Sequence, residues 1–170
     1  DLSASLSSAA LLSCAVSDRD GDVPFKVTKG SAVGGLLDPH EIVLDRVPDG
    51  SHQIAEERLV EGMTLDTILR RLPARAKTLV KLDMEGAELL ALKGADEALR
   101  AQKPLVIMSE VFFVNYRRGQ AFFWDLASHL HRYGYLFDGL YDVRETSQGR
   151  LYTGNGVWVN STVGNRLGFG

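Results

Sequence analysis

The sequence predicts an α/β fold in which helices cover a mostly parallel β-sheet and the closing strand is antiparallel. From residue 64 onward, short β-rich segments alternate with segments of helical period, and this alternation is typical of βαβ units. The connections are long enough for right-handed crossovers, which place consecutive strands parallel to each other. Turn residues lie between the last two strand-like segments, and they favour an antiparallel closing pair.

The composition is that of a folded globular domain. The 170 residues are 45% hydrophobic and 24% charged, and a chain of this length can bury its own core. The 19 basic and 22 acidic residues give a net charge of −3, so no basic face for nucleic acid is expected. The longest apolar run, residues 104–114, is far shorter than a membrane span. We therefore expect a single domain over residues 1–170 that binds neither nucleic acid nor a membrane.

The first residues resemble a targeting segment only in their apolar length. Residues 7–16 are apolar, but no Lys or Arg precedes them and Asp1 has the wrong sign for a signal peptide. Residues 11–16 are therefore interpreted as a buried strand. Cys14 is the only cysteine, which excludes an internal disulfide and fits a reducing, cytoplasmic compartment.

The next part of the chain is predicted to contain a hairpin and an irregular insertion. The Asp20-Gly21 pair is a turn signal between the strand-like residues 11–16 and 23–28. Glycine and proline punctuate residues 29–62, which predicts an irregular insertion or short hairpins within the domain and no helix.

Regular elements follow from residue 64. Thr64 can cap a helix that runs through Arg71, with Leu65, Ile68, Leu69 and Leu72 as its buried stripe, and Pro73 ends it. The predicted strands are residues 78–83, 105–109, 135–137 and 157–159, with a turn at residues 154–156 before the last. The predicted helices are residues 87–92, 95–101 and 121–133.

Two consecutive predicted strands end in acidic residues. Asp83 ends one strand, with Glu85 and Glu88 just after it, and Glu110 ends the next. The carboxyl ends of parallel strands meet at one edge of a sheet, where ligands bind. Like charges crowded there repel unless a ligand, a cation or a proton intervenes. A structural alternative is that Glu85 and Glu88 only stabilise the start of a helix.

Residues 81–88 (KLDMEGAE) closely resemble the lysine-x-aspartate-x-glutamate-glycine-x-glutamate block of the FkbM family of S-adenosylmethionine-dependent methyltransferases. Further short motifs follow the family's order, and the resemblance runs from about residue 11 to residue 159. These motifs are residues 15–18 (AVSD), 64–66 (TLD), 92–95 (LKGA) and 104–111 (PLVIMSEV).

The resemblance implies a Rossmann-like class I methyltransferase sheet, with S-adenosylmethionine as cofactor and no metal. It implies methyl transfer to a hydroxyl of a small-molecule or glycan acceptor, such as a sugar or a polyketide. Such a hydroxyl needs a general base, and Glu85 is the first choice, followed by Glu110 or Glu88.

The resemblance also implies three cofactor-binding residues. Asp83 would shape the floor of the site near the sulfonium, because negative charge favours the cation. Ser17 and Asp18 leave the preceding strand and are candidates to hydrogen-bond the adenine.

Two parts of the family pattern have no counterpart here. They are a glycine-rich turn that supports the methionine part of the cofactor and an upstream acid that holds the ribose hydroxyls; residues 30–35 have the wrong spacing for the turn. Because the chain also begins at Asp1, without a methionine, we expect it to be N-terminally incomplete and to bind S-adenosylmethionine weakly or not at all. One edge or face of its sheet should then be exposed.

Two alternatives to a methyltransferase stay open. In a magnesium-dependent hydrolase or phosphotransferase, Asp83, Glu85 and Glu110 would hold the ion through their oxygens. In a non-catalytic methyltransferase remnant, the domain would bind a partner or a glycan.

Other polar residues are interpreted as structural. The four histidines, His40, His52, His129 and His131, are not expected to act in catalysis. Arg117 and Arg118 beside Tyr116 are interpreted as a solvated loop, with an acceptor site as the alternative. The Gly34-Gly35 pair is either an ordinary turn or a flexible cover over a substrate.

Overall fold

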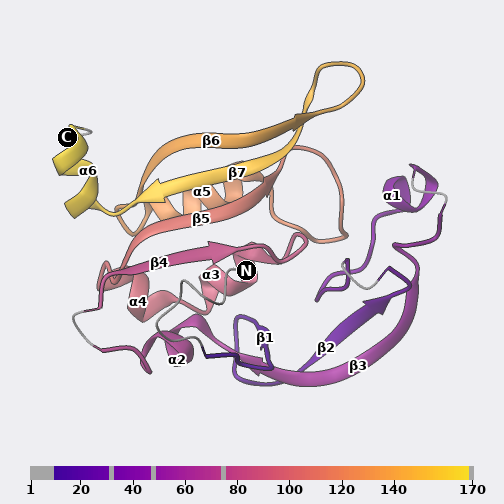
Figure 1. Cartoon of the computed structure of the whole chain (residues 1–170), viewed down its shortest axis with the longest axis horizontal. Coiled ribbons are helices and arrows are strands. Elements are labelled where there is room, and N and C mark those ends of the chain that lie inside the picture. The colour runs from indigo at the N-terminus through magenta and orange to yellow at the C-terminus, as the bar shows by residue number, and fades with distance from the viewer. Residues whose placement is uncertain (1–9, 31–32, 47–48, 74–75, 169–170) are drawn as a thin grey trace, which may run out of the picture.

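The structure, a computed structural model, describes residues 10–30, 33–46, 49–73 and 76–168. These residues form a mixed α/β fold with two small sheets (Figure 1). The strands of the first sheet, in the order β1-β3-β2, are β1 (Ala15–Val16), β2 (Gly21–Thr28) and β3 (Ile54–Met63). The strands of the second, in the order β4-β5-β7-β6, are β4 (Thr78–Leu82), β5 (Pro104–Phe112), β6 (Leu136–Glu145) and β7 (Leu151–Val159).

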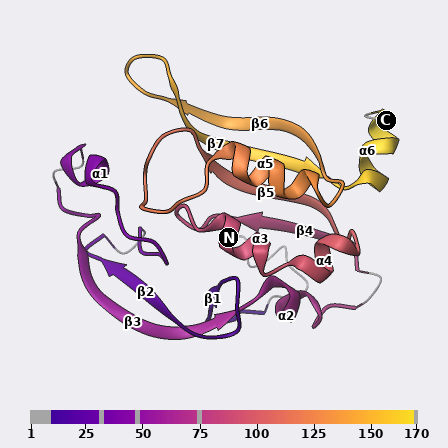
Figure 2. The same ribbon diagram turned by 180° about the vertical axis from the view of Figure 1, so that it is seen from behind.

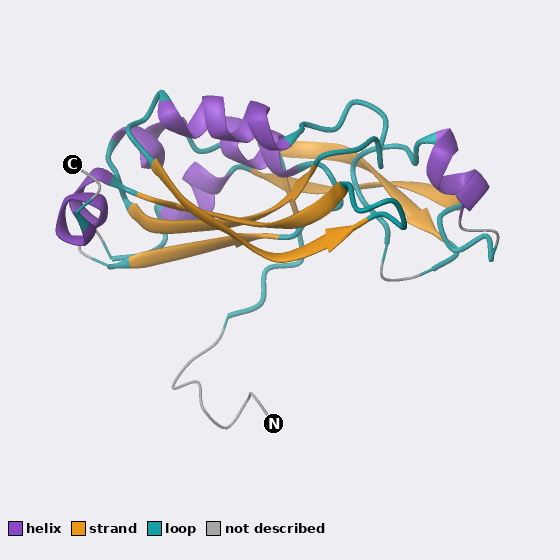
Figure 3. Ribbon diagram, turned by 90° about the horizontal axis from the view of Figure 1, so that it is seen from above, coloured by secondary structure: helices purple, strands orange, loops and turns teal. Residues whose placement is uncertain are grey.

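The helices α3, α4 and α5 cover one face of the second sheet. They lie behind its strands in Figure 1 and in front of them when the molecule is seen from behind in Figure 2. The view from above in Figure 3 shows the same layering. The helices of the described residues are α1 (Glu41–Arg46), α2 (Leu65–Leu69), α3 (Glu88–Lys93), α4 (Asp96–Arg100), α5 (Phe123–His131) and α6 (Ser161–Leu167).

The predicted α/β class is confirmed, but the Rossmann-like, mostly parallel sheet is not. β4 pairs with β5 in parallel and β1 pairs with β3 in parallel, whereas the pairs β2–β3, β5–β7 and β6–β7 are antiparallel. A crossover of helical length lies between β4 and β5 and makes them parallel, whereas a short turn over residues 146–150 makes β6 and β7 a hairpin. The antiparallel closing pair is confirmed, and its strands are longer than predicted.

The first sheet differs from the hairpin predicted for residues 11–16 and 23–28. β1 contains only Ala15 and Val16, and these pair with Gly62 and Met63 of β3, not with β2. Leu11 is 95% exposed, so the predicted buried strand is wrong at its beginning. Residues 29–62 are also more regular than predicted, because they contain α1 and most of β3.

The glycines of residues 154–156 do not form a turn. Gly154 and Gly156 lie within β7, and the turn of the hairpin contains Gly149, whose φ is +72°. A Cβ atom at position 156 would lie 2.5 Å from the Trp158 ring, so glycine there makes room for a buried indole. The predicted turn at residues 154–156 is therefore wrong, and the glycines there are explained by close packing within β7.

The helix starts and breaks agree with the prediction. The Thr64 hydroxyl caps α2 by accepting a hydrogen bond from the Thr67 N–H at 3.1 Å. α3 and α4 are separated at Gly94, where the sequence predicts an interruption. Leu72 is the exception, because α2 ends at Leu69 and leaves the Leu72 side chain 41% exposed.

The core lies between the second sheet and its helices. Leu82 and Ile107 from the sheet pack with Leu92, Leu126 and Trp158, and all five are buried. This packing orients β4 and β5. β4 ends at Leu82, beside Ser109, whereas β5 continues through Phe112, so Glu110 lies within the strand and not at its predicted end.

An exposed edge is present at β4. Within the described ranges β4 pairs only with β5, and Leu79, on the sheet face away from the helices, is 64% exposed. Across the described ranges, every helix is too short or too polar to cross a membrane.

We predict that Gly94→Ala destabilises the fold. A Cβ atom at position 94 would lie 2.3 Å from the carbonyl oxygen of Ser17, so β1 and α3 must move apart, at a cost of about 1–3 kcal/mol. The free energy of unfolding, from urea denaturation, measures the effect. Gly35→Ala is the matched control, because its nearest contact would be an ordinary 3.6 Å. Equal free energies for the two variants would contradict the prediction.

Candidate functional site

The loop after β4 has an unusual backbone. Glu85 has a φ of +54° and Gly86 a φ of +96°, so two successive residues are left-handed. This conformation costs a non-glycine residue about 1–3 kcal/mol and is often found at functional sites. Glycine is required next, because a Cβ atom at position 86 would lie 3.1 Å from Gln120 and 3.2 Å from Arg117.

The Glu88 side chain stabilises this loop through hydrogen bonds to its backbone. Its Oε1 accepts hydrogen bonds from the backbone N–H groups of Met84 at 2.9 Å and Gly86 at 3.3 Å. The residue is 1% exposed, and burial raises the pKa of its carboxyl to about 7 in spite of these bonds. Glu88 is therefore placed inside the protein, and its contacts favour a structural role over the alternative role of base.

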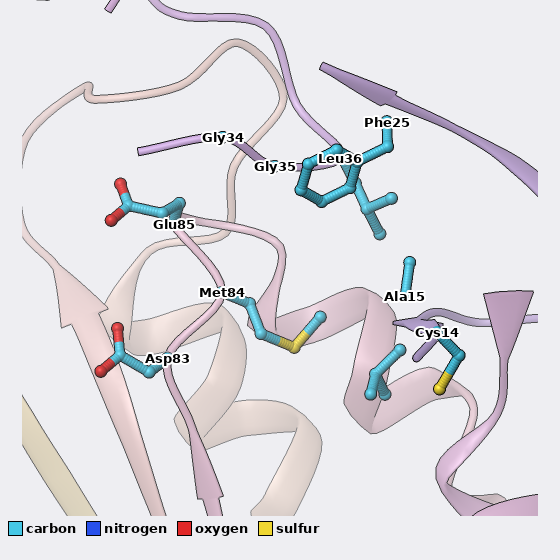
Figure 4. Close-up of a pocket in the computed structure, with 10 residues that line it drawn as sticks. Cys14, Ala15, Phe25, Gly34, Gly35, Leu36, Asp83, Met84 and Glu85 are labelled. Carbon is cyan, nitrogen blue, oxygen red and sulfur yellow. The ribbon is translucent and has the colours of Figure 1, made fainter. Parts of the chain in front are cut away.

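A cavity of about 540 Å³ lies between the loop and the first sheet. Figure 4 shows the carboxylates of Asp83 and Glu85 at one side of the cavity and Cys14 at the opposite side, with the Met84 side chain between them. The cavity is therefore apolar over most of its wall and acidic at one end. Its lining residues are Cys14, Ala15, Val16, Phe25, Gly34, Gly35, Leu36, Asp83, Met84 and Glu85.

Asp83 and Glu110 follow paired residues of adjacent strands. Leu82, the last residue of β4, pairs with Ser109, so Asp83 just beyond β4 lies next to Glu110, which pairs with Asn155 of β7. Burial raises the pKa of Glu110, and the charges of Glu85 and Asp83 raise it further. The Thr153 hydroxyl donates a hydrogen bond to Glu110 Oε1 at 3.2 Å. The predicted crowding of these three carboxylates is thus present.

Asp83 is the exposed member of the group. Its Oδ2 lies 2.7 Å from Lys81 Nζ, and both side chains are more than half exposed. The negative charge of Glu110 also contributes to raising the pKa of Lys81. Lys81 therefore compensates part of the negative charge at this edge.

Arg117 is the residue that the sequence interpretation missed. It is 2% exposed, and the predicted solvated loop is therefore wrong at this position. Its Nη2 lies 3.0 Å from Glu85 Oε2 and donates a second hydrogen bond, at 2.6 Å, to the carbonyl oxygen of Val33. No pattern of the sequence distinguishes Arg117 from Arg118, which is exposed and pairs with Glu41. Only the tertiary structure does so.

An aromatic group surrounds the Arg117 guanidinium. Tyr116 lies with its ring 4.9 Å from the guanidinium carbon and stacks on Phe112 at 5.0 Å. His52 meets Tyr116 edge-on at 5.6 Å, and burial, with the nearby Arg117 charge, lowers the pKa of the imidazole. His52 is therefore neutral at pH 7.

Ser17 and Asp18 lie beside the cavity but do not line it. Ser17 is buried, its N–H donates to the Met63 carbonyl at 3.0 Å, and its hydroxyl donates to Asp18 Oδ1 at 3.1 Å. Val16, immediately before them, is part of the cavity wall. Their predicted contact with adenine stays a prediction.

Asp83, Glu85 and Glu110 form the acidic edge beside the cavity, and they are the residues that would hold a magnesium ion in the alternative hydrolase. Among the residues that the structure describes, no three His, Cys, Asp or Glu side chains are grouped so that they could hold a metal ion. Asp83, Glu85 and Glu110 are close enough to influence one another, but they do not form such a group.

Comparison with protein families gives one match. The model of the methyltransferase FkbM domain matches residues 3–137, which include β1 to β5, the cavity and the acidic edge. The chain belongs to the FkbM methyltransferase family. No curated protein and no solved structure gives a significant match.

Family membership gives the loop after β4 a chemical context. In this FkbM domain, the block at residues 81–88 forms the left-handed loop, with Glu88 below it and Asp83 and Glu85 at the cavity. Methyl transfer is the activity of the family, so the cavity beside this block is the candidate active site.

We predict that Glu88→Gln changes the pH dependence of stability in this FkbM domain. The carboxyl is neutral in the fold below its raised pKa of about 7, whereas in the unfolded chain it ionises near its ordinary pKa of 4.5. The favourable contribution of Glu88 is therefore complete below pH 4.5 and is lost as the pH rises through 7. Relative to Glu88→Gln, the native protein should lose about 3 kcal/mol over this range.

Urea unfolding of both proteins between pH 5 and pH 8, in steps of one unit, measures this difference. Glu61→Gln, which removes an exposed carboxylate from β3, controls for the loss of one negative charge. A stability difference that is the same at every pH would show that burial of Glu88 does not perturb its ionisation.

Proposed function

We propose that this domain is an S-adenosylmethionine-dependent methyltransferase that O-methylates a hydroxyl on a sugar or natural-product acceptor. Family membership supports methyl transfer in general. The observation that carries the finer proposal is the cavity, in which an apolar wall ends at a group of interacting carboxylates.

The chemistry of the cavity fits this cofactor. Phe25, Leu36 and Met84 offer apolar surface for a flat ring, and Asp83 and Glu85 offer negative charge toward a cation. When bound, S-adenosylmethionine supplies a methyl group on a positively charged sulfur. Ser17 and Asp18 follow the apolar wall and are proposed to hydrogen-bond the adenine.

Glu110 has the environment best suited to a general base. It is half-buried, its pKa is raised, and its contacts in the described structure include a hydroxyl donor but no ion pair. A raised pKa strengthens a carboxylate as a proton acceptor. Glu85, the first choice from the sequence, is ion-paired to Arg117, so one of its carboxylate oxygens is already engaged. We therefore propose Glu110 as the base and keep Glu85 as the alternative.

The proposed transfer depends mainly on positioning. Glu110 would accept the proton of an acceptor hydroxyl held between it and the cavity, and S-adenosylmethionine would supply the methyl group and leave as the neutral thioether S-adenosylhomocysteine. The negative charges of Asp83 and Glu85 would hold the positive sulfur near this point. The domain's own groups thus bind, orient and accept a proton.

We predict that S-adenosylhomocysteine protects Cys14 from thiol reagents. Cys14 is the only cysteine and lines the cavity, so its reaction rate with a disulfide reagent reports on occupancy. The rate should fall in a saturable manner as the ligand is raised to millimolar concentration, so that weak binding is also detected.

Adenosine and homocysteine, each alone, serve as controls for partial occupancy. A reaction rate that stays constant up to millimolar S-adenosylhomocysteine would contradict binding in this cavity. It would favour the non-catalytic alternative for this domain.

We predict that Glu110→Gln lowers turnover by about 10²–10⁴ with little change in cofactor affinity, because the amide cannot accept the proton. Transfer of a labelled methyl group from S-adenosylmethionine to a panel of sugars and hydroxyl-bearing natural products measures turnover, and calorimetry measures affinity. Glu145→Gln, at the exposed end of β6, is the matched control. Full turnover in Glu110→Gln together with a large loss in Glu85→Gln would return the role of base to Glu85.

A further inference from the structure

We propose that Arg117 is a positioning residue that fixes Glu85 at the cavity as a permanent hydrogen-bond acceptor for a hydroxyl or ammonium group of the bound ligand. The role follows from contacts among three segments of the chain that are distant in sequence. The ligand part of this proposal rests on the proposed function, whereas the positioning part does not.

The first argument is the burial of the guanidinium. The Arg117 side chain is 1% exposed, and a charge removed from water is strongly unfavourable unless it is paired. Among the described residues, Glu85 is the one carboxylate within ion-pair distance of it, at 3.0 Å. The Glu85 side chain is 21% exposed, so the pair joins the protein interior to the cavity surface.

The second argument is that the Arg117 backbone is itself firmly held. Gln120 Oε1 accepts hydrogen bonds from the N–H groups of Tyr116 at 2.8 Å and Arg117 at 2.5 Å. Gln120 Nε2 donates to the Val114 carbonyl at 2.9 Å. A single side chain thus closes the turn from which Arg117 extends, and the guanidinium has little freedom to follow a moving partner.

The third argument is that Glu85 is also restricted. Its backbone is left-handed, and the following Gly86 packs so closely on Arg117 and Gln120 that a Cβ atom would lie within 3.2 Å of both side chains. The Glu85 carboxylate is therefore fixed from the backbone side by the loop and from the other side by Arg117. A carboxylate held in this way suits ligand binding better than proton transfer.

Arg117 also connects the opposite wall of the cavity. It donates to the Val33 carbonyl, directly before Gly34 and Gly35, which line the cavity. Gly35 is held to Lys26 of β2 by two backbone hydrogen bonds, at 2.8 and 3.1 Å. The guanidinium therefore links Glu85 to the wall that faces it, and so helps to set the width of the cavity.

The electrostatic surroundings make Glu85 dependent on Arg117. Burial lowers the pKa of His52, so Arg117 is the cation of this group, while Lys81 pairs with Asp83. Among the described residues, Arg117 is the one cation in ion-pair contact with Glu85. The other charged or titratable groups that interact with Glu85 are His52, Tyr116 and Glu110.

The first test is carbon-13 NMR of the Glu85 side chain in the ligand-free protein at pH 7. Arg117→Gln should average the side-chain couplings of Glu85 over several rotamers, because the ion pair that fixes the carboxylate is lost. Arg117→Lys should keep a single rotamer. Arg118→Gln is the matched control, since it removes an exposed positive charge one residue away. A single, unchanged Glu85 rotamer in Arg117→Gln would overturn the positioning role.

The second test is a double-mutant cycle on the affinity for S-adenosylhomocysteine at pH 7. Arg117→Gln should weaken binding, and Arg117→Lys should keep most of it. The double variant of Arg117→Gln with Glu85→Gln should bind no more weakly than Glu85→Gln alone, because Arg117 acts through Glu85. Losses that add in the double variant would show a separate structural role and would overturn the proposal. If the native protein does not bind the ligand at all, the proposed function fails, while the NMR measurement still decides the positioning role.

A third variant keeps the proposal testable if Arg117→Gln does not fold. Glu85→Gln should bind S-adenosylhomocysteine about 10–100-fold more weakly than the native protein at pH 7, because a hydrogen bond to a charged acceptor is lost. Native affinity in Glu85→Gln would show that the carboxylate does not contact the ligand, and would overturn this part of the proposal.

Discussion

The ion pair between Arg117 and Glu85 is the interaction on which the geometry of the site depends. A buried guanidinium is tolerated only next to an opposite charge, and this charge comes from a left-handed residue of the loop after β4. The same guanidinium binds the Val33 carbonyl beside the facing wall. Three segments that are far apart in sequence are therefore connected at one point, and the cavity lies next to it.

Because of this ion pair, Glu85 has a different environment from the two other glutamates near the loop, Glu88 and Glu110. Glu85 is matched with a cation and is suited to contact a positive or hydrogen-bonding ligand. Glu110 is half-buried near negative charges, and both raise its pKa. Its carboxylate therefore accepts a proton more readily than an exposed glutamate does. Glu88 is buried beneath the loop and supports two backbone N–H groups. The environment of each carboxyl, and not its place in the motif, indicates what it can do.

The sequence predicted the local elements better than their assembly. The cap at Thr64, the strand before Asp83 and the break at Gly94 depend on neighbouring residues, and each was predicted close to its observed place. Strand pairing depends on distant residues, so the parallel pairing of β1 with β3 and the length of the β6–β7 hairpin were not predicted. Arg117 was misjudged for the same reason: burial of one arginine of an adjacent pair is decided by tertiary contacts.

The block at residues 81–88 has two roles: some of its residues shape the loop after β4, and others line the cavity. Gly86 is required by a left-handed backbone and by the approach of Arg117, and Glu88 is used in holding the loop. Asp83 and Glu85 are the two acidic members of this block that line the cavity. A match to such a block therefore identifies the loop geometry first. The chemistry of the site comes from what that geometry brings together, namely Glu110 from the adjacent strand and Arg117 from a turn beyond it.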